Sequence, residues 1–426
     1  MKFENFSSLQ KILLYGYGRE GQSSEKFLKS KFPHIALTIF EDREGISKPD
    51  FSSFDLILVS PGIPRKKITG VLPSKITSQT ELFFDNLTES QRKKIIGIGG
   101  TKGKSTTTKF CAEVLQNAGM KVAIGGNFGR PLLELWDDFQ GNKIEYIVAE
   151  LSSYQLEYLT ISPGIAIFLN FFPDHLDRHG TVESYFEAKK NLWSHQHSGD
   201  IFIVPESSRP LFLGKEKHTP LFSKKIEAEL FPKGSVFRAD HWRDNFGAVS
   251  LLLSQLKLQP VALQSTTGAF QGLPHRMQYF ATKKGILFYD DTISTNPDST
   301  LATLKFFGEN LGSVILGGQD RKQNFAKLMS YLHPLETHLI FLDSEISSRL
   351  VESASSEGIP KNRISLAKDL REAVQIAFAH TPKKTSCVLS PTAPSYDRFK
   401  NFEEKGNEFQ REVETFHKEK VIRKKV

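Results

Sequence analysis

The sequence has little cysteine and no long apolar run, and each absence excludes a class of protein. Two cysteines in 426 residues are too few for the disulfide framework of a small secreted domain. The longest apolar runs, such as residues 146–149 and 165–169, fall far short of the roughly 18 to 20 residues that span a bilayer. The first ten residues, MKFENFSSLQ, lack the apolar core of a signal peptide. We therefore expect a cytoplasmic protein that does not cross a membrane.

Acidic charge is also in deficit. The chain has 56 Lys and Arg against 48 Asp and Glu, which gives a net charge of +8 and a pI near 9.1. An excess of positive charge is typical of proteins that bind nucleic acid, anionic membranes or phosphate-bearing substrates. Here the basic residues are scattered as doublets and triplets, and a basic cluster stands at residues 417–426. Scattered charge is typical of a solvated surface, so we expect neither a nucleic-acid partner nor a membrane partner.

The remaining composition is that of an ordinary globular protein. Apolar residues make up 39% of the chain and charged residues 24%, which excludes intrinsic disorder. At about 150 residues per domain, the length suggests about three domains. Apolar strand-like runs alternate with helix-like stretches, the pattern of an α/β fold with largely parallel sheets. The expected strands are residues 11–15, 35–40, 55–59, 95–98, 146–149, 165–169, 201–204, 286–289, 314–316, 339–342 and 387–389.

Two restarts of this pattern divide the chain. A charged join, ESQRKK, precedes the strand at 95–98, and a third series of units starts after residues 268–274. We therefore predict domains at residues 1–90, 91–272 and 273–426. In the first of them the glycine turn GYGREG follows the first strand and fits the pattern G-x-G-x-x-G. By itself this turn leaves a dinucleotide-binding domain open as an alternative.

The strongest local signal is GIGGTKGKSTTT, residues 97–108, which we call the phosphate loop. It lies between an expected strand and a helix that we expect to begin near Thr106. Backbone N–H groups of a glycine-rich turn bind phosphates there, a lysine reaches the terminal phosphates and a hydroxyl binds Mg²⁺. Those two roles fall to Lys104 and Ser105. The spacing departs from the strict pattern, because Ile98 stands where a glycine is usual.

Two later segments offer partners for the metal of an ATP site. The run IEYIVAE puts Glu150 at the carboxyl end of an expected strand, which is where parallel sheets bind ligands. The next strand is followed by FFPDHLDRHG, in which His175 stands among acidic residues. Carboxylates and imidazole can complete the shell of Mg²⁺, although this ion prefers oxygen. The alternative for both residues is a solvated loop position.

These motifs, in this order, resemble the central domain of the Mur ligase superfamily of ATP-dependent amide-forming enzymes. The resemblance is carried by GTKGKST, ELSSYQLE, NFFPDHLDRH and YFEAKKNLW. In the last third, GLPHRMQ, DDTISTNPDST, LGGQDR and LSPTAPSYDRFKNFEEKGNEF are similar to the branch that adds D-glutamate. The resemblance spans essentially the whole chain. It implies an N-terminal Rossmann-like UDP-binding domain, a central P-loop ATPase-like domain with a mostly parallel sheet, and a C-terminal Rossmann-like α/β domain.

The resemblance also implies the reaction. ATP phosphorylates the alanine carboxylate of UDP-N-acetylmuramoyl-L-alanine (UDP-MurNAc-L-Ala), and the amine of D-glutamate attacks the acyl phosphate. Two Mg²⁺ ions are implied as well, and we expect a monomer, although the sequence itself does not determine the oligomeric state. In the family a lysine of the motif Tyr-x-x-Ala-Lys is carbamylated by CO₂, and here it is Lys189. A helical lysine beside Lys190 is ordinarily exposed, whereas carbamylation requires a lysine whose pKa is lowered.

Residue roles follow from the same resemblance. The implied catalytic residues are Lys104, His175 and Lys189. The implied ATP-binding residues are Gly103, Lys104, Ser105, Thr106, Asn245, Arg276 and Asp291. The implied metal ligands are Ser105, Glu150, His175 and Lys189. Asn127, Ser152, Gln155 and His175 match contacts to the muramoyl-alanine portion, and Thr295, Arg321, Ser395 and Phe402 match contacts to D-glutamate.

Four positions depart from the family pattern. Lys102 replaces a common Asn of the phosphate loop, and Trp242 stands where an Asn often contacts adenine. Ile293 replaces a lysine near the substrate, and Arg321 is a lysine in other members. These departures bear on single substrate contacts and leave the reaction class as it is.

Two other functions remain as alternatives. One is a member of the same superfamily that adds a different amino acid or acts on folate, although the D-glutamate-type segment near residue 395 favours the branch named above. The other is a non-catalytic module that binds nucleotide or nucleic acid through the +8 charge. A steep salt dependence of DNA binding would support that second alternative.

Overall fold

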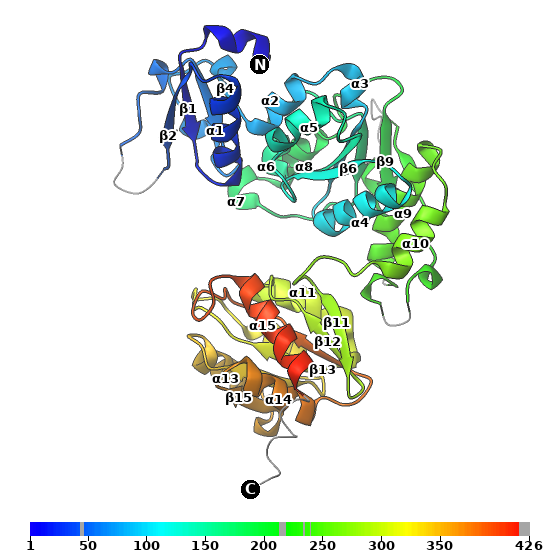
Figure 1. Ribbon diagram of the computed structural model, residues 1–426. Helices are drawn as coiled ribbons and strands as arrows, with labels where there is room; N and C mark the ends of the chain where they lie inside the picture. Colours follow the sequence, from blue (N-terminus) through cyan, green and yellow to red (C-terminus); the bar gives the residue numbers. More distant parts are fainter. Residues whose placement is uncertain (43–46, 213–218, 233–234, 239, 417–426) are drawn as a thin grey trace. The chain divides into compact units, whose positions relative to one another are not determined.

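The computed structural model describes residues 1–42, 47–212, 219–232, 235–238 and 240–416. The fold is α/β, as the sequence predicts, with helices packed on three largely parallel sheets (Figure 1). Each expected strand coincides with an observed one. The basic cluster at residues 417–426 lies outside the described part of the chain. Among the described residues, no helix is long and apolar enough to cross a membrane.

The three sheets follow one another along the chain. The first has the strand order β2-β1-β3-β4, the second β10-β9-β8-β5-β7-β6 and the third β11-β12-β16-β13-β14-β15. Strands of the first two sheets are β1 Lys11–Tyr15, β2 Ala36–Phe40, β3 Leu56–Val59, β4 Ile76–Thr77, β5 Ile95–Gly99, β6 Val122–Gly126, β7 Tyr146–Glu150, β8 Ile165–Phe168, β9 Ile201–Pro205 and β10 Leu221–Ser223. Strands of the third are β11 Gln278–Lys283, β12 Ile286–Asp290, β13 Leu311–Leu316, β14 His338–Leu342, β15 Ile364–Ala367 and β16 Ser386–Leu389.

Helices connect the strands in the crossover manner that parallel pairing requires. Those of residues 1–270 are α1 Arg19–Lys31, α2 Gln79–Asp85, α3 Glu89–Arg92, α4 Lys104–Asn117, α5 Trp136–Gln140, α6 Ser153–Leu156, α7 Leu176–His179, α8 Val182–Lys190, α9 Asp240–Gln255 and α10 Val261–Ala269. Those of the remainder are α11 Pro297–Phe307, α12 Ala326–Leu332, α13 Ser347–Ser356, α14 Leu370–His380 and α15 Phe402–Thr415.

Some strands escape the sequence pattern, and their burial explains why. β15 is mostly half-buried or exposed, and β11 is antiparallel to β12 with no fully buried residue. β6 ends in two glycines and is only partly buried. Such strands lack the continuous apolar run by which a strand buried on both faces is found in a sequence.

Contacts between residues divide the chain into two compact units, Met1–Phe270 and Gln271–Val426. The first unit holds two sheets that share one apolar core. In this core Trp136 packs edge-on against both Phe3 and Phe83. Each sheet lies within one of the three predicted domain ranges, but the boundary predicted at residue 90 stays a prediction because the shared core crosses it.

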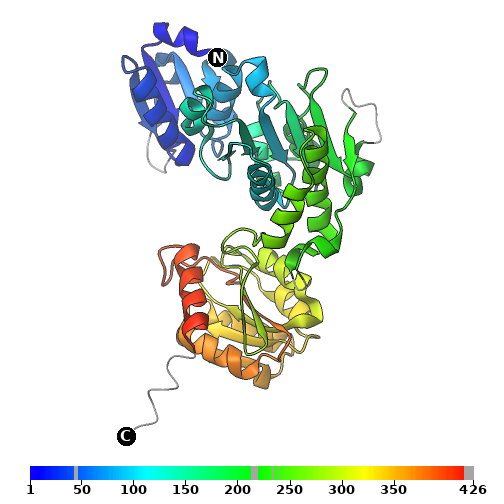
Figure 2. The same cartoon turned by 45° about the vertical axis from the view of Figure 1, so that its right-hand side comes forward.

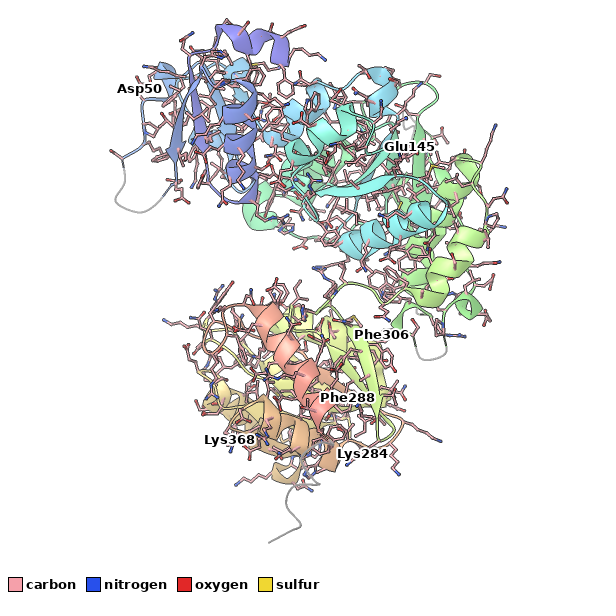
Figure 3. All side chains as sticks on the ribbon, in the orientation of Figure 1. Asp50, Glu145, Lys284, Phe288, Phe306 and Lys368 are labelled. Atoms are coloured by element: carbon pink, nitrogen blue, oxygen red, sulfur yellow. The ribbon has the colours of Figure 1, made fainter. Side chains whose placement is uncertain are left out.

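The second unit has its own core between its sheet and two helices. α14 and α15 pack side by side, as Figures 1 and 2 show. Phe288 of β12, labelled in Figure 3, is fully buried and contacts the ring of Phe409 on α15. Leu370 and Val374 of α14 belong to the same apolar cluster. This packing fixes the loops that follow β12, β13 and β16, which carry the predicted amino-acid contacts.

Candidate active site

The phosphate loop lies where the sequence predicts, between β5 and α4. Gly100 and Gly103 have φ angles of +137° and +83°, a backbone region in which glycine carries no steric cost. Helix α4 begins at Lys104, two residues before the expected start at Thr106. The first N–H groups of a helix have no partner within it, so this end of α4 is suited to bind an anion.

Asn170 holds the phosphate loop in shape, a role that the sequence analysis missed. Its side-chain oxygen accepts hydrogen bonds from the N–H groups of Thr101 at 3.2 Å and Lys102 at 2.9 Å. Its amide nitrogen donates to the Lys102 carbonyl at 3.0 Å. The signal was a polar residue two positions after β8, at the same edge of the sheet as the loop.

The side chains of the first turn of α4 remain beside the loop. Lys104 Nζ donates to the carbonyl of Thr101 at 3.0 Å, so the lysine folds back over the loop backbone. Ser105 is half-buried, and Thr106 is buried. The predicted phosphate-binding residues therefore share one helix end.

Asn245, on α9, reaches the same loop. A Cβ atom at position 103 would lie 2.5 Å from Asn245 Nδ2 and 3.5 Å from the ring of Trp242. Gly103 is therefore needed for this close approach as well as for its positive φ. Trp242 is buried and stacks on Phe246, so the departure at position 242 packs into the core of the first unit.

Glu150 ends β7 beside the start of the loop, because it pairs with Ile98 in the register of β5 and β7. Its side chain is 1% exposed. Asn127 Nδ2 donates to Glu150 Oε1 at 2.6 Å, whereas Glu150 Oε2 is buried without a hydrogen-bond partner. A buried carboxylate oxygen without a partner is costly unless a cation or a donor joins it.

Lys189 is buried although it stands on a short helix next to another lysine. Its side chain is 1% exposed, and Nζ donates to the Gly100 carbonyl at 2.7 Å. Burial, and secondly the neighbouring charge of Lys104, lower the pKa of Lys189 to about 7. A large share of this amine is therefore neutral at neutral pH, the state that reacts with CO₂.

Tyr185 lies between Lys189 and His175, and the sequence analysis did not assign it a role. Lys189 Nζ is 4.5 Å from the centre of its ring, and the His175 ring centre is 6.0 Å away. Its hydroxyl lies 3.3 Å from Thr101 Oγ1. His175 is half-exposed, with φ +53°, and Nδ1 lies 3.1 Å from the Tyr154 hydroxyl. The signal for Tyr185 was the first residue of the YFEAK motif.

Ser152 and Gln155, predicted to contact substrate, are engaged with each other as the capping box of α6. Gln155 Nε2 also donates to Glu20 Oε1 at 2.6 Å. Burial raises the pKa of Glu20 to about 7 against the opposing effects of Gln155 and Arg19. A cavity of about 360 Å³ adjoins this contact, with residues of the GYGREG turn, residues 60–63, Gly126, Asn127 and Pro131 in its wall.

In the second unit, the predicted contacts to the amino acid lie on loops after three adjacent strands. Thr295 follows β12, Arg321 follows β13 and Ser395 follows β16, with Phe402 at the start of α15. These strands stand in the order β12-β16-β13, so their carboxyl ends meet at one edge. The Thr295 carbonyl accepts a hydrogen bond from Gln323 at 3.2 Å. We call these four residues, whose contact with an amino acid stays a prediction, the amino-acid pocket.

Ionisation and exposure differ sharply within that unit. Arg321 is exposed, whereas Ser395 is buried and its Oγ has no hydrogen-bond partner. Arg276 is exposed and precedes Met277, whose N–H donates to Asp291 Oδ1 at 3.1 Å. Burial raises the pKa of Asp291 to about 6. Arg276 and Asp291 therefore belong to one local structure, while Asn245 belongs to the first unit.

The predicted metal ligands contain two residues of the usual ligand types, Glu150 and His175. Among the described residues, no group of three His, Cys, Asp or Glu side chains is arranged to hold a metal ion. Any divalent ion here would therefore depend on phosphate oxygens, water, Ser105 or a modified Lys189 for further ligands.

Known families match both units of the chain. Residues 98–247 match the Mur ligase middle domain, and residues 275–392 match the Mur ligase glutamate ligase domain. A UDP-N-acetylmuramoylalanine–D-glutamate ligase from Pelotomaculum thermopropionicum is 29% identical, covering 94% of this chain and 96% of that protein. One with the same name from Geotalea uraniireducens is 30% identical with the same coverage. A UDP-N-acetylmuramoyl-L-alanine–L-glutamate ligase from Salinispora tropica is 28% identical over 95% of this chain and 97% of that one.

Solved structures agree on the fold. The UDP-N-acetylmuramate-alanine ligase MurC from Thermotoga maritima matches with a TM-score of 0.56 at 17% identity, covering 95% of this chain and 99% of that one. The MurF ligase from the same organism, in complex with ADP, matches with a TM-score of 0.55 at 17% identity, covering 97% and 98%. Because two models of the family match most of the chain and a relative is 30% identical over 94% of it, the chain belongs to the Mur ligase family.

Proposed function

We propose that the chain is an ATP-dependent ligase of peptidoglycan synthesis, acting in the cytoplasm as a monomer. It joins D-glutamate to UDP-MurNAc-L-Ala through an acyl phosphate and releases ADP and phosphate. The observation that carries the proposal is the edge of the second sheet. There, the start of α4 with the ammonium of Lys104 follows β5, and Glu150, whose Oε2 lacks a hydrogen-bond partner, ends the adjacent strand β7.

The chemistry of the reaction explains why such a site is needed. A carboxylate is a poor electrophile, so it must be phosphorylated before an amine attacks it. Phosphoryl transfer between two anions depends on positioning and on neutralising charge. Lys104 supplies positive charge at the terminal phosphates, and the N–H groups of the phosphate loop bind phosphate oxygens.

The residues at this edge fit a bound Mg²⁺ ion. Glu150 Oε2 is buried and lacks a partner, and Ser105 stands in the first turn of α4. We assign these two to one ion, and His175 with a carbamylated Lys189 to a second. When bound, Mg²⁺ would neutralise charge on the phosphate oxygens.

The carbamate forms when the neutral amine of Lys189 attacks CO₂. A nitrogen–carbon bond forms, the nitrogen gives up a proton to solvent, and an anionic carbamate results. Two observations support it: the burial of Lys189, and the proximity of Lys104, whose charge disfavours the ammonium form. The carbamate would then face a cationic neighbour.

The remaining substrates are assigned to the other parts of the chain. UDP-MurNAc-L-Ala would enter the cavity beside the GYGREG turn, with Asn127, Ser152 and Gln155 near its muramoyl-alanine end. Asn245, Arg276 and Asp291 would contact ATP. The amino-acid pocket would hold D-glutamate. We keep residues 1–90, 91–272 and 273–426 as the domains that carry these three tasks.

L-Glutamate is a second candidate substrate, because one relative of equal coverage is named for it. The test is phosphate release by the purified protein with ATP, Mg²⁺ and UDP-MurNAc-L-Ala, adding D-glutamate, L-glutamate or other amino acids in turn. We expect release with D-glutamate, and none from a folded Lys104→Ala variant. Turnover with L-glutamate alone would make L-glutamate the substrate in place of D-glutamate. Turnover with neither amino acid would overturn the proposed function.

A further inference from the structure

Lys405, on the first turn of α15, is a second buried lysine whose position the reaction does not explain. Its side chain is 1% exposed, and a buried ammonium is costly unless it is paired. Nζ donates to the Gly317 carbonyl at 2.6 Å. Burial lowers the pKa of Lys405 to about 8, opposed first by the nearby carboxylate of Asp397.

The acceptor of this hydrogen bond lies at the start of the loop that carries Arg321. Gly317 directly follows β13, with φ +145°, and opens the loop that carries Arg321. Two residues later, the N–H of Gln319 donates to the Pro394 carbonyl at 2.8 Å. The loop of Arg321 is therefore bound to the loop of Ser395 backbone to backbone, and Lys405 fixes its first carbonyl.

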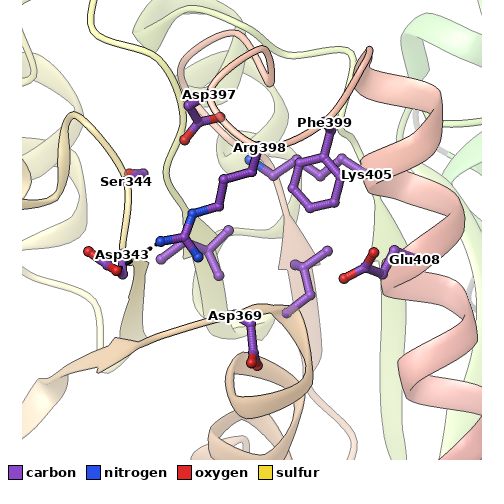
Figure 4. A pocket seen from close by; sticks show the side chains of 10 residues that line it. Asp343, Ser344, Asp369, Asp397, Arg398, Phe399, Lys405 and Glu408 are labelled. Carbon is purple, nitrogen blue, oxygen red and sulfur yellow. Dashed lines mark hydrogen bonds and ion pairs between the residues drawn. The ribbon is translucent and has the colours of Figure 1, made fainter.

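The other side of Lys405 faces a cavity of about 200 Å³, drawn in Figure 4. The Lys405 side chain extends from α15 past the ring of Phe399, whose centre is 5.7 Å from Nζ. Asp397 Oδ1 is buried without a hydrogen-bond partner. Arg398 is turned away to pair with Asp343 at 2.8 Å. Burial raises the pKa of Asp397, and the first influence that opposes this rise is the positive charge of Lys405.

We infer that Lys405 is a positioning residue that sets the amino-acid pocket in the geometry that binds a dicarboxylate. It acts on one loop through the Gly317 carbonyl, on the second through Asp397, and on Phe402 through the first turn of their common helix. The inference rests on the proposed function, because it names what holds the pocket rather than what fills it.

The protonation state of Lys405 provides a pH-dependent readout. If the side chain acted only by packing, the affinity for a dicarboxylate would not follow its protonation. The charged groups around it come from the loops after β14, β15 and β16 and from α15; they are Asp343, Asp369, Asp397, Arg398 and Glu408. As the pH rises through about 8, Lys405 loses its charge and its attraction for Asp397. The pocket should then loosen, and binding of a dicarboxylate should weaken.

The first experiment uses steady-state kinetics of Lys405→Met, Lys405→Arg and the matched control Lys400→Met, an exposed lysine of the same segment. We expect Lys405→Met to raise KM for D-glutamate about tenfold, because a small misplacement of binding groups is costly. The KM values for ATP and UDP-MurNAc-L-Ala should stay unchanged. Lys405→Arg should restore most of the affinity, and Lys400→Met should behave as the wild type.

The second experiment compares the wild type with Lys405→Arg. Glutarate carries both carboxylates but no amine, so the pH dependence of its inhibition constant against D-glutamate reports the pocket alone. We expect this constant to rise as the pH passes about 8 in the wild type, and to stay flat in Lys405→Arg.

Two results would overturn the inference while the ligase activity stands. One is an inhibition constant for glutarate that does not change with pH in the wild type. The other is a folded Lys405→Met variant that loses affinity for all three substrates alike, which would indicate general destabilisation. A wild-type protein with no turnover of D-glutamate would instead refute the proposed function.

Discussion

Two lysines, Lys189 in the first unit and Lys405 in the second, are buried to the same degree and reach the same kind of acceptor. Each donates to the carbonyl of a glycine at the end of a central strand, Gly100 after β5 and Gly317 after β13. Both glycines have positive φ, +137° and +145°. Both lysines have a lowered pKa, about 7 and about 8.

The charges beside them differ, and this difference separates their roles. The largest electrostatic influence on Lys189 after burial is the like charge of Lys104, which disfavours its ammonium form. The largest for Lys405 is the opposite charge of Asp397, which favours that form. On this difference we base the two proposals, a reactive amine at Lys189 and a structural cation at Lys405.

The largest effect should come from removing Lys189. We expect Lys189→Ala to lower kcat by about 10³-fold, the size of losing a well-placed electrostatic group. Acetate should restore part of the activity, because a short carboxylate can replace the carbamate anion. Kinetics with and without acetate measure it, and Lys190→Ala is the matched control.

The proposed difference between the two lysines would be refuted if acetate restored the activity of Lys405→Met equally, or if Lys189→Ala retained full activity. Intact-mass analysis under CO₂ adds an independent check: only wild-type protein and variants that keep Lys189 should gain the mass of one CO₂.

A smaller effect is expected at Arg321, which we propose to pair with a carboxylate of D-glutamate. Arg321→Lys keeps the charge but loses the fork geometry of the guanidinium. We expect KM for D-glutamate to rise about tenfold and KM for ATP to stay constant, because a charge-assisted hydrogen bond contributes about 1.5–3 kcal/mol. Lys322→Arg, one residue along the same exposed loop, is the control. An equal shift for every substrate would mean that Arg321 does not contact D-glutamate.

Glu20 extends the comparison to a buried acid, and its effect is on stability. Burial raises the pKa of Glu20 to about 7, so the folded protein binds more protons than the unfolded chain between about pH 4.5 and 7. Glu20 therefore lowers the free energy of unfolding as the pH rises through this window. Glu20→Gln should remove this part of the pH dependence. Denaturant unfolding of both proteins at pH 5 and pH 8 tests this. The prediction is refuted if the free energy of unfolding changes by the same amount between the two pH values in the wild type and in Glu20→Gln.

The smallest effect is expected at Ile293, where the family pattern has a lysine. Ile293 is half-buried, and its N–H donates to the His275 carbonyl at 3.1 Å. That bond does not depend on the side chain, so Ile293→Lys should be tolerated. We expect KM for D-glutamate and ATP to change less than about twofold, with equal or better affinity for UDP-MurNAc-L-Ala. Loss of activity in the folded variant would contradict this expectation.

Much of this site could be read from the sequence because its signals are local. The phosphate loop is a continuous glycine-rich segment after an apolar strand, and Glu150 ends the next strand but one. Asn170 and Tyr185 were missed, although each stood in a motif that drew attention, because the contacts that matter join segments about 70 and 84 residues apart. No periodicity along the chain reports such a contact.

By itself, the sequence determined the α/β class, the main strands and the phosphate loop, since these follow from apolar runs and from the backbone freedom of glycine at fixed spacing. Only the tertiary structure decided the ionisation of the buried groups. Lys189 and Lys405 each stand in a charged, helical segment that reads as exposed surface. Their burial, and whether a cation or a carboxylate lies beside them, depends on how distant helices pack against the sheets, and burial and neighbouring charge together set a pKa.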